Sequence, residues 1–235
     1  TFEVAGVQRT LTNSTHQYDW IGRLDVNTTN NRIYGRHIYQ KITPLNVPYR
    51  GAAGYPANVP SLTNGIGLSW TRTLSARMVN EARVSYFRLN VEFGGNTIGN
   101  TIPPMAKLGE ALANVTMPSG YLAWGPPNNM PQGRIVNTTQ VQDNWSYVRG
   151  RHQMKAGFNY SWQRSINTFL PNYNGTYAFG TWRDFGRNRP SSISITLGTP
   201  TLDFREHDSS FYIGDDIKFT RNFTYAVAYT WGKAM

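Results

Sequence analysis

The chain has 235 residues, of which 15% are charged and 14% aromatic, with a net charge of +10 and no cysteine. The lack of cysteine excludes a disulfide scaffold, a thiolate metal site and a cysteine nucleophile. Lys and Arg are spread singly rather than in a basic run, which argues against a nucleic-acid partner, and no apolar run approaches the roughly 20 residues of a membrane helix.

Eight segments alternate between apolar and polar side chains with the period of two that is typical of a β-strand. The clearest covers 154–166, where Met154, Phe158 and Trp162 share one face while Lys155 and Asn159 share the other. Globular strands usually run about 5–6 residues, whereas a membrane strand needs roughly 9–11. The lengths therefore favour a membrane. In chain order the segments are 18–26, 32–42, 65–74, 79–93, 136–148, 154–166, 204–219 and 223–231.

The connections between these segments alternate between short and long. Short polar turns of the hairpin type lie at 27–31, 75–77, 149–151 and 220–222. Long connections rich in Pro and Gly lie at 43–64, 94–135 and 167–202. Long structureless loops are uncommon in a compact soluble domain, but outer-membrane barrels have short periplasmic turns and long outer loops. The sequence thus predicts an all-β fold, a portion of an antiparallel transmembrane β-barrel.

Two details of this interpretation remain open. Within the long connections, 105–114 and 183–197 are predicted to form short helices. A soluble β-sandwich with aromatic core faces is the competing fold, but it explains neither the strand length nor the alternation of the loops. The five tryptophans inside predicted strands support the membrane interpretation, because Trp prefers the membrane interface. They are Trp20, Trp70, Trp145, Trp162 and Trp231.

The sequence shows no catalytic or metal-binding motif, so we expect no enzyme activity and no cofactor. The four histidines lie on separate segments without a zinc-binding spacing. Asp215 and Asp216 are adjacent, so they should face opposite sides of a strand and make a poor dyad. Aromatic residues in the long loops are the weak candidates for ligand contacts, with simple loop packing favoured over stacking on a ligand. They are Tyr55, Tyr121, Trp124, Tyr173, Tyr177 and Trp182.

Several motifs resemble those of a known family. They are NRIYGR at 31–36, VNEAR at 79–83, QDNW at 142–145, RGRHQMKAGFNY at 149–160, GTYAF at 175–179 and FYIGDDIKFTRNFT at 211–224. Together they resemble TonB-dependent outer-membrane receptors, in particular the Oar-like group with a carboxypeptidase-regulatory-like front domain. Each motif is weak alone, but they occur in the family's order and cover nearly the whole chain.

The resemblance implies a barrel of about 22 strands with a plugged lumen. Eight strands are a fraction of that, so we expect residues 1–235 to form one partial barrel domain, without the plug, the TonB box and the front domain. The tail at 229–235, YTWGKAM, resembles a strand that the family places much later. We therefore hypothesise that residues are missing near 224–225.

Three functions remain possible at this stage. The resemblance implies uptake of a bulky nutrient across the bacterial outer membrane, with lipid and the TonB system as partners. Alternatively, a barrel fragment with two open strand edges could self-associate into an extracellular tube or filament, because open edges pair with other chains. A small barrel of eight strands that closes on itself is the third possibility.

Overall fold

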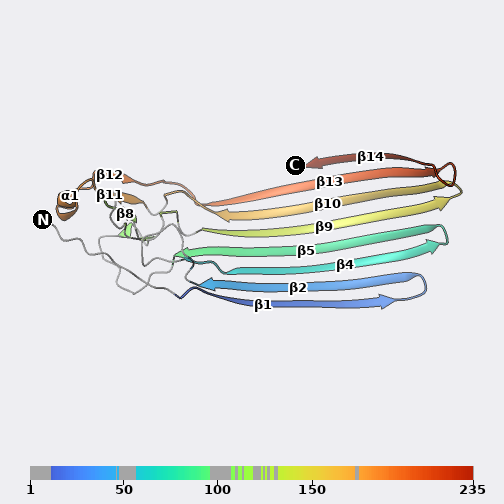
Figure 1. Cartoon of the computed structure of the whole chain (residues 1–235), viewed down its shortest axis with the longest axis horizontal. Coiled ribbons are helices and arrows are strands. Elements are labelled where there is room, and N and C mark those ends of the chain that lie inside the picture. The colour runs from blue at the N-terminus through green and yellow to red at the C-terminus, as the bar shows by residue number, and fades with distance from the viewer. Residues whose placement is uncertain are drawn as a thin grey trace.

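Eight long strands pair side by side in chain order and form one antiparallel sheet (Figure 1). The computed structural model describes residues 12–45, 47, 57–95, 107–108, 111–112, 114–118, 123, 125, 128–129, 132–172 and 175–234. The long strands are β1 (Ser14–Asn27), β2 (Asn31–Leu45), β4 (Ser61–Ser75), β5 (Met78–Gly95), β9 (Gln132–Arg149), β10 (His152–Thr168), β13 (Thr201–Lys218) and β14 (Thr224–Ala234).

All eight predicted strands are confirmed, as is the all-β antiparallel barrel fold class. The strands extend beyond most of the predicted bounds, because the backbone ladders continue after the alternating pattern has ended. Within the described residues β1 and β14 do not pair with each other, so the barrel is not closed in this chain. A two-residue strand, β3 (Ala57–Asn58), adds to β5 at the loop end.

The four short turns lie at one end of the sheet, and the described parts of the long connections lie at the other, as predicted (Figure 1). In the first turn, the amide of Thr28 donates to the carbonyl of Asn31 at 2.7 Å. Gly150, in the third turn, has a φ of 60°, which glycine adopts without the steric penalty of a Cβ atom. The tight turns join strands that pair with each other, and beside the second turn the register shifts between Thr73 and Ser75.

Successive turns are displaced along the sheet in one direction. Asn31, the first residue of β2, pairs with Arg72, which lies before the end of β4. Met78, the first residue of β5, pairs with Tyr147, which lies before the end of β9. A stagger of this kind is what strands need when they tilt relative to the axis of a barrel.

The registers assign every strand residue to one of two faces, because directly opposed residues in an antiparallel pair point to the same side. The apolar face holds the even-numbered residues of β10, including Phe158, whose ring lies 4.9 Å from that of Phe211. The polar face holds the odd-numbered residues of β10. All five strand tryptophans lie on the apolar face: Trp20, Trp70, Trp145, Trp162 and Trp231.

The sheet has no hydrophobic core of its own. Phe179, in a loop, is the one buried hydrophobic side chain in the described part of the chain, at 7% exposure. Large apolar side chains on the strands are exposed instead, among them Leu24 at 72% and Tyr229 at 65%. Burial of this face must come from a surrounding apolar phase. Among the described residues, no helix is long and apolar enough to cross a membrane.

The helix predicted at 105–114 is wrong where the structure describes it. These residues form β6 (Lys107–Leu108), β7 (Ala111–Leu112) and the start of β8 (Asn114–Thr116). Local helix propensity is a weak signal that pairing with neighbouring backbone overrides.

The helix predicted at 183–197 is right only in its first turn. The observed helix, α1 (Trp182–Gly186), follows Thr181, whose hydroxyl caps it by accepting from the Asp184 amide at 3.0 Å. It ends before Asn188, whose φ of 52° is incompatible with a continuing helix. The rest of the predicted segment contains β12 (Ser192–Ser194).

Candidate functional site

The polar face carries a network of amide side chains across β9 and β10. Gln140 and Gln142 both donate to Oδ1 of Asn159, at 2.8 and 3.1 Å. The hydroxyl of Thr138 donates to Oε1 of Gln163 at 3.4 Å. Such groups need water or one another, so this face fits the wet interior of a barrel.

Two ion pairs on the same polar face each join residues of a single strand. Arg23 binds Asp25 on the same strand at 2.7 Å. Arg83 binds Glu81, also on its own strand, at 2.6 Å. Both pairs are half-exposed, so each contributes little to stability, but they balance charge along the polar face.

One aromatic side chain crosses the polar face. Tyr212 of β13 lies over Gly157 of β10 and donates from its hydroxyl to Oδ1 of Asn144 on β9, at 2.9 Å. A Cβ atom on Gly157 would lie 2.2 Å from Cε1 of Tyr212. The missing side chain at Gly157 is therefore what lets Tyr212 connect three strands.

The apolar face carries its aromatic residues toward both ends of the strands. Between them lie aliphatic side chains such as Leu68 and Val84, which pair across β4 and β5. The pattern matches the aromatic girdles and apolar band of a membrane barrel. Toward the loops lie Tyr18, Trp20, Tyr39, Tyr86 and Trp162, and toward the turns lie Trp70, Trp145, Tyr147 and Tyr225.

Described segments of two long loops fold together at the far end of the sheet (Figure 1). β8, from the connection between β5 and β9, pairs in parallel with β11 (Thr176–Ala178), from the connection between β10 and β13. β11 also pairs with β12. Beside these strands, Phe179 packs edge-on against Phe185, with ring centroids 5.1 Å apart. These segments thus form one small folded unit above the barrel wall, the loop unit, which contains β8, β11, β12 and α1.

Asn172 joins the parts of this loop unit. Its amide nitrogen donates to Oγ of Ser194 at 2.7 Å, and its Oδ1 accepts from Asn128 at 3.0 Å and from Thr176 at 2.8 Å. Its φ of 58° places the backbone in the left-handed region, which Asn tolerates better than most residues. One side chain therefore links both loops.

The loop aromatics predicted as ligand contacts divide into two groups. Tyr177 lies half-buried in β11, and Trp182 packs edge-on against Phe185 at 6.0 Å between ring centroids. Both belong to the loop unit, and for Trp182 the ring contact is a packing contact. The other four candidates lie outside the described residues: Tyr55, Tyr121, Trp124 and Tyr173.

Asp215 and Asp216 face opposite sides of β13, as predicted. Asp215 accepts from Nδ1 of His152 at 2.6 Å on one face. Asp216 binds Lys155 at 3.4 Å on the other. In the part of the chain that the structure describes, no group of three or more His, Asp or Glu residues gathers at metal-binding distance.

Sequence reasoning missed the residues that link separate segments. Asn172 lies between Pro171 and Gly175 in the sequence, and such a setting indicates a turn with a left-handed residue. The sequence does not indicate that Asn128 is the hydrogen-bond partner of Asn172. The contact of Tyr212 with Gly157 depends on the register between β10 and β13, which residue types alone do not give.

The sequence matches the family described as "Outer membrane beta barrel domain" over residues 4–235. A search of curated proteins finds no match. The structure is similar to the outer membrane transporter YddB from Escherichia coli, with a TM-score of 0.59 and 8% identity, covering 94% of this chain and 27% of that one. It is also similar to BauA, the ferric preacinetobactin receptor from Acinetobacter baumannii, with a TM-score of 0.53 and 12% identity, covering 95% of this chain and 34% of that one.

Proposed function

The chain belongs to the outer membrane beta barrel domain family of the bacterial outer membrane, and from that premise we propose that it forms part of the wall of a nutrient receptor. The receptor would take up a bulky nutrient with energy from the TonB system and would belong to the Oar-like group. The chain spans about a third or less of the length of the two similar structures, an outer membrane transporter and a ferric preacinetobactin receptor.

The division of the sheet into two faces is the observation that carries the proposal. The apolar face, with its aromatic ends, suits lipid, whereas the amide network around Asn159 suits a wet lumen. The sheet is open along β1 and β14 in the described residues, as expected for a piece of a wider barrel wall. A wide lumen leaves room for a plug and a large ligand.

The loop unit is the proposed place of ligand capture. Long outer loops carry function more often than the scaffold that positions them. Tyr177 and Trp182 belong to this unit, and Tyr55, Tyr121, Trp124 and Tyr173 are proposed as further contacts from the sequence. Aromatic rings would stack on flat or sugar-like surfaces of the ligand. The role is uptake rather than catalysis.

Growth of a gene-deletion strain tests the transport proposal. The strain is grown with ferric siderophores, cobalamin or oligosaccharides as the limiting nutrient. We expect loss of growth on at least one of them, restored by the wild-type gene but not in a strain that lacks TonB. Unchanged growth on every nutrient, or restoration without TonB, would contradict the proposal.

A second candidate function rests on the open edges. The backbone of β1 and β14 is unpaired on one side within the described residues, and such edges bind other strands. Several copies could therefore join edge to edge into a tube or filament. Mass measurement in detergent and electron micrographs of a detergent-free sample separate the two functions. A single copy that needs detergent supports the receptor, and a regular assembly without detergent supports the filament.

A further inference from the structure

A row of basic and amide side chains crosses the loop-side end of the apolar face. The registers pair each member with the next on the neighbouring strand, so all of them point to the same side, with neighbouring strands about 4.8 Å apart. We refer to these residues as the outer basic row: Arg205, Arg164, Asn137, Arg88 and Asn64, on β13, β10, β9, β5 and β4.

The outer basic row keeps an excess of positive charge. Asp203 is shared by Arg164, at 2.9 Å, and by Arg205, at 3.4 Å. Arg88 donates to Oδ1 of Asn137 at 3.1 Å and makes no ion pair with any carboxylate in the described part of the chain. The three arginines therefore share one carboxylate, and their side chains remain accessible from the apolar face.

The position of the row relative to the membrane follows from its neighbours. On the side of the short turns, the next row contains Trp162 and Tyr86, and the row after that contains Val84 and Leu68. An arginine at the bilayer midplane costs about 2–4 kcal/mol, falling to roughly 0–1 near the interface. The row therefore marks the boundary of the membrane on the side of the long loops, which is the outer leaflet.

We propose that the outer basic row binds the phosphate groups of a phosphorylated glycolipid in the outer leaflet. Arginine matches phosphate with paired N–H donors, and such bonds strengthen where water is partly excluded. Oδ1 of Asn137 already accepts from the hydroxyl of Tyr86, at 2.9 Å, and from Arg88. Since Oδ1 of Asn137 accepts both bonds, its amide nitrogen would serve as a further donor to phosphate.

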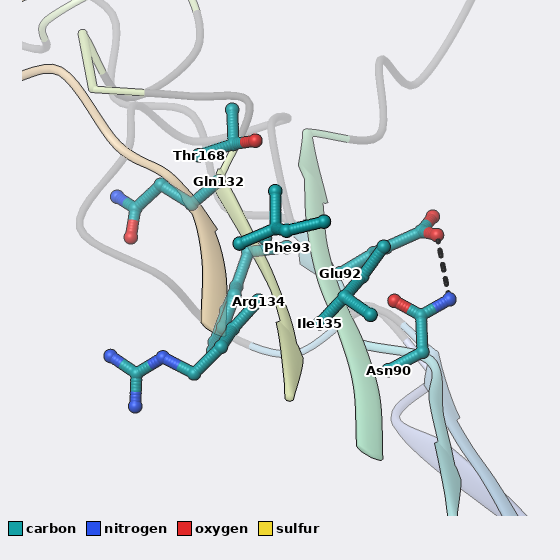
Figure 2. A pocket seen from close by; sticks show the side chains of 9 residues that line it. Asn90, Glu92, Phe93, Gln132, Arg134, Ile135 and Thr168 are labelled. Atoms are coloured by element: carbon teal, nitrogen blue, oxygen red, sulfur yellow. Dashed lines mark hydrogen bonds between the residues drawn. The ribbon is translucent and has the colours of Figure 1, made fainter. Parts of the chain in front are cut away.

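A groove of about 300 Å³ lies directly beyond the row, toward the loops. Ile135 and Ile166 line it, and Gly133 adds no side chain that would fill it. Figure 2 shows Asn90 and Glu92 on one side, joined by a hydrogen bond of 3.4 Å, and Thr168 across from them.

This groove suits the sugar of the headgroup rather than its phosphate. A sugar ring has apolar faces that pack on aliphatic side chains and hydroxyls that bond to polar edges. Two charged side chains line the groove. Arg134 belongs to the polar face, where its Nε donates to Oδ1 of Asn167 at 2.8 Å. Glu92 belongs to the apolar face, where its carboxylate accepts hydroxyl protons and repels phosphate. The groove and the outer basic row therefore distinguish a phosphorylated sugar from a simple phospholipid. The proposal rests on the membrane location and not on transport.

Lipid carried through purification tests the proposal. The protein that contains this chain is extracted from outer membranes in mild detergent, and bound diphosphorylated lipid A is measured by mass spectrometry. The test variant replaces Arg88, Arg164 and Arg205 with Gln. We expect it to retain at least fivefold less lipid A than the wild type. The control variant, Arg32→Gln with Arg36→Gln, removes basic residues from the polar face and should retain wild-type amounts.

A second variant keeps the test informative if the first one misfolds. Asp203→Asn releases Arg164 and Arg205 from their shared carboxylate, so it should increase the retained lipid A. Dephosphorylated lipid A, phosphatidylglycerol and inorganic phosphate serve as competitors. Equal lipid A retention by the wild type and the triple variant would overturn the proposal. Displacement by phosphatidylglycerol or by phosphate as effective as displacement by lipid A itself would overturn the glycolipid assignment.

Discussion

At the scale of single residues, the fold depends on contacts in which a large side chain packs over a glycine. Tyr212 covers Gly157 and reaches Asn144, so three strands are connected by one hydroxyl and one absent Cβ atom. Aromatic cover of a glycine is a known device for setting strand register. These contacts were not predictable, because they require the register before the partner can be named.

Gly157→Ala is expected to destabilise the sheet by about 1–3 kcal/mol, the usual cost of overpacking a fitted site. The new Cβ atom would meet Cε1 of Tyr212 at 2.2 Å and displace the ring. Urea titration of the protein in lipid vesicles measures the change. Gly67→Ala is the control on the same face, since its nearest neighbour would lie at 3.9 Å. Similar losses in both variants would show that the Tyr212 contact is unimportant.

Asn172→Ala is expected to loosen the contact between the two long loops while leaving the eight long strands paired. The variant loses three side-chain hydrogen bonds, each worth about 1 kcal/mol. Cleavage within 167–202 by a protease should then become about tenfold faster or more. Asn188→Ala is the matched control, because Asn188 also has a positive φ, of 52°. Equal acceleration in both variants would assign the effect to the backbone.

At the scale of elements, the strands and short turns were predictable and the loop structure was not. Alternation of apolar and polar residues over long segments predicts the strands, and polar turn residues predict the hairpins. Both signals can be recognised from the sequence because they are local. Pairing of β8 with β11 joins residues far apart in the sequence. The failed helix at 105–114 has a different cause, since β6 and β7 pair with each other inside that segment and replace the predicted helix.

A charge on the apolar face should be far more harmful than one on the polar face of the same strand. Val84→Arg would place a guanidinium among Leu68 and Val141 in the apolar band, and we expect a loss of about 2–4 kcal/mol. Ser85→Arg, one residue away, points to the polar face and should change stability by about 0.5 kcal/mol or less. Refolding titrations in vesicles compare the two variants. Equal effects would contradict the assignment of the faces.

At the scale of the whole molecule, an open sheet without a core takes its stability from its surroundings. The exposure of side chains such as Leu24 and Tyr229 is compatible with a folded protein only where lipid covers them. That residues are missing near 224–225, and that plug and front domains belong to the same protein, stay predictions. The sequence of the complete gene decides both.

Tryptophan fluorescence can report how the whole sheet lies in the membrane. Two variants are prepared, one with Trp145 and one with Trp182 as the sole tryptophan. Trp145 lies on the apolar face of β9, whereas Trp182 begins α1 in the loop unit. Brominated lipids should quench Trp145 strongly and leave Trp182 close to its value in unbrominated lipid. Equal quenching would contradict the proposed orientation.

The pairing of every long strand with its neighbour in the chain has an evolutionary consequence. A hairpin of two strands and a tight turn can be duplicated or deleted without rerouting the rest of the chain. In the described part of the sheet, no strand from elsewhere lies between the two strands of a hairpin. The perimeter of such a barrel can therefore change between descendants in steps of two strands. The even strand numbers of bacterial single-chain barrels agree with growth by this unit.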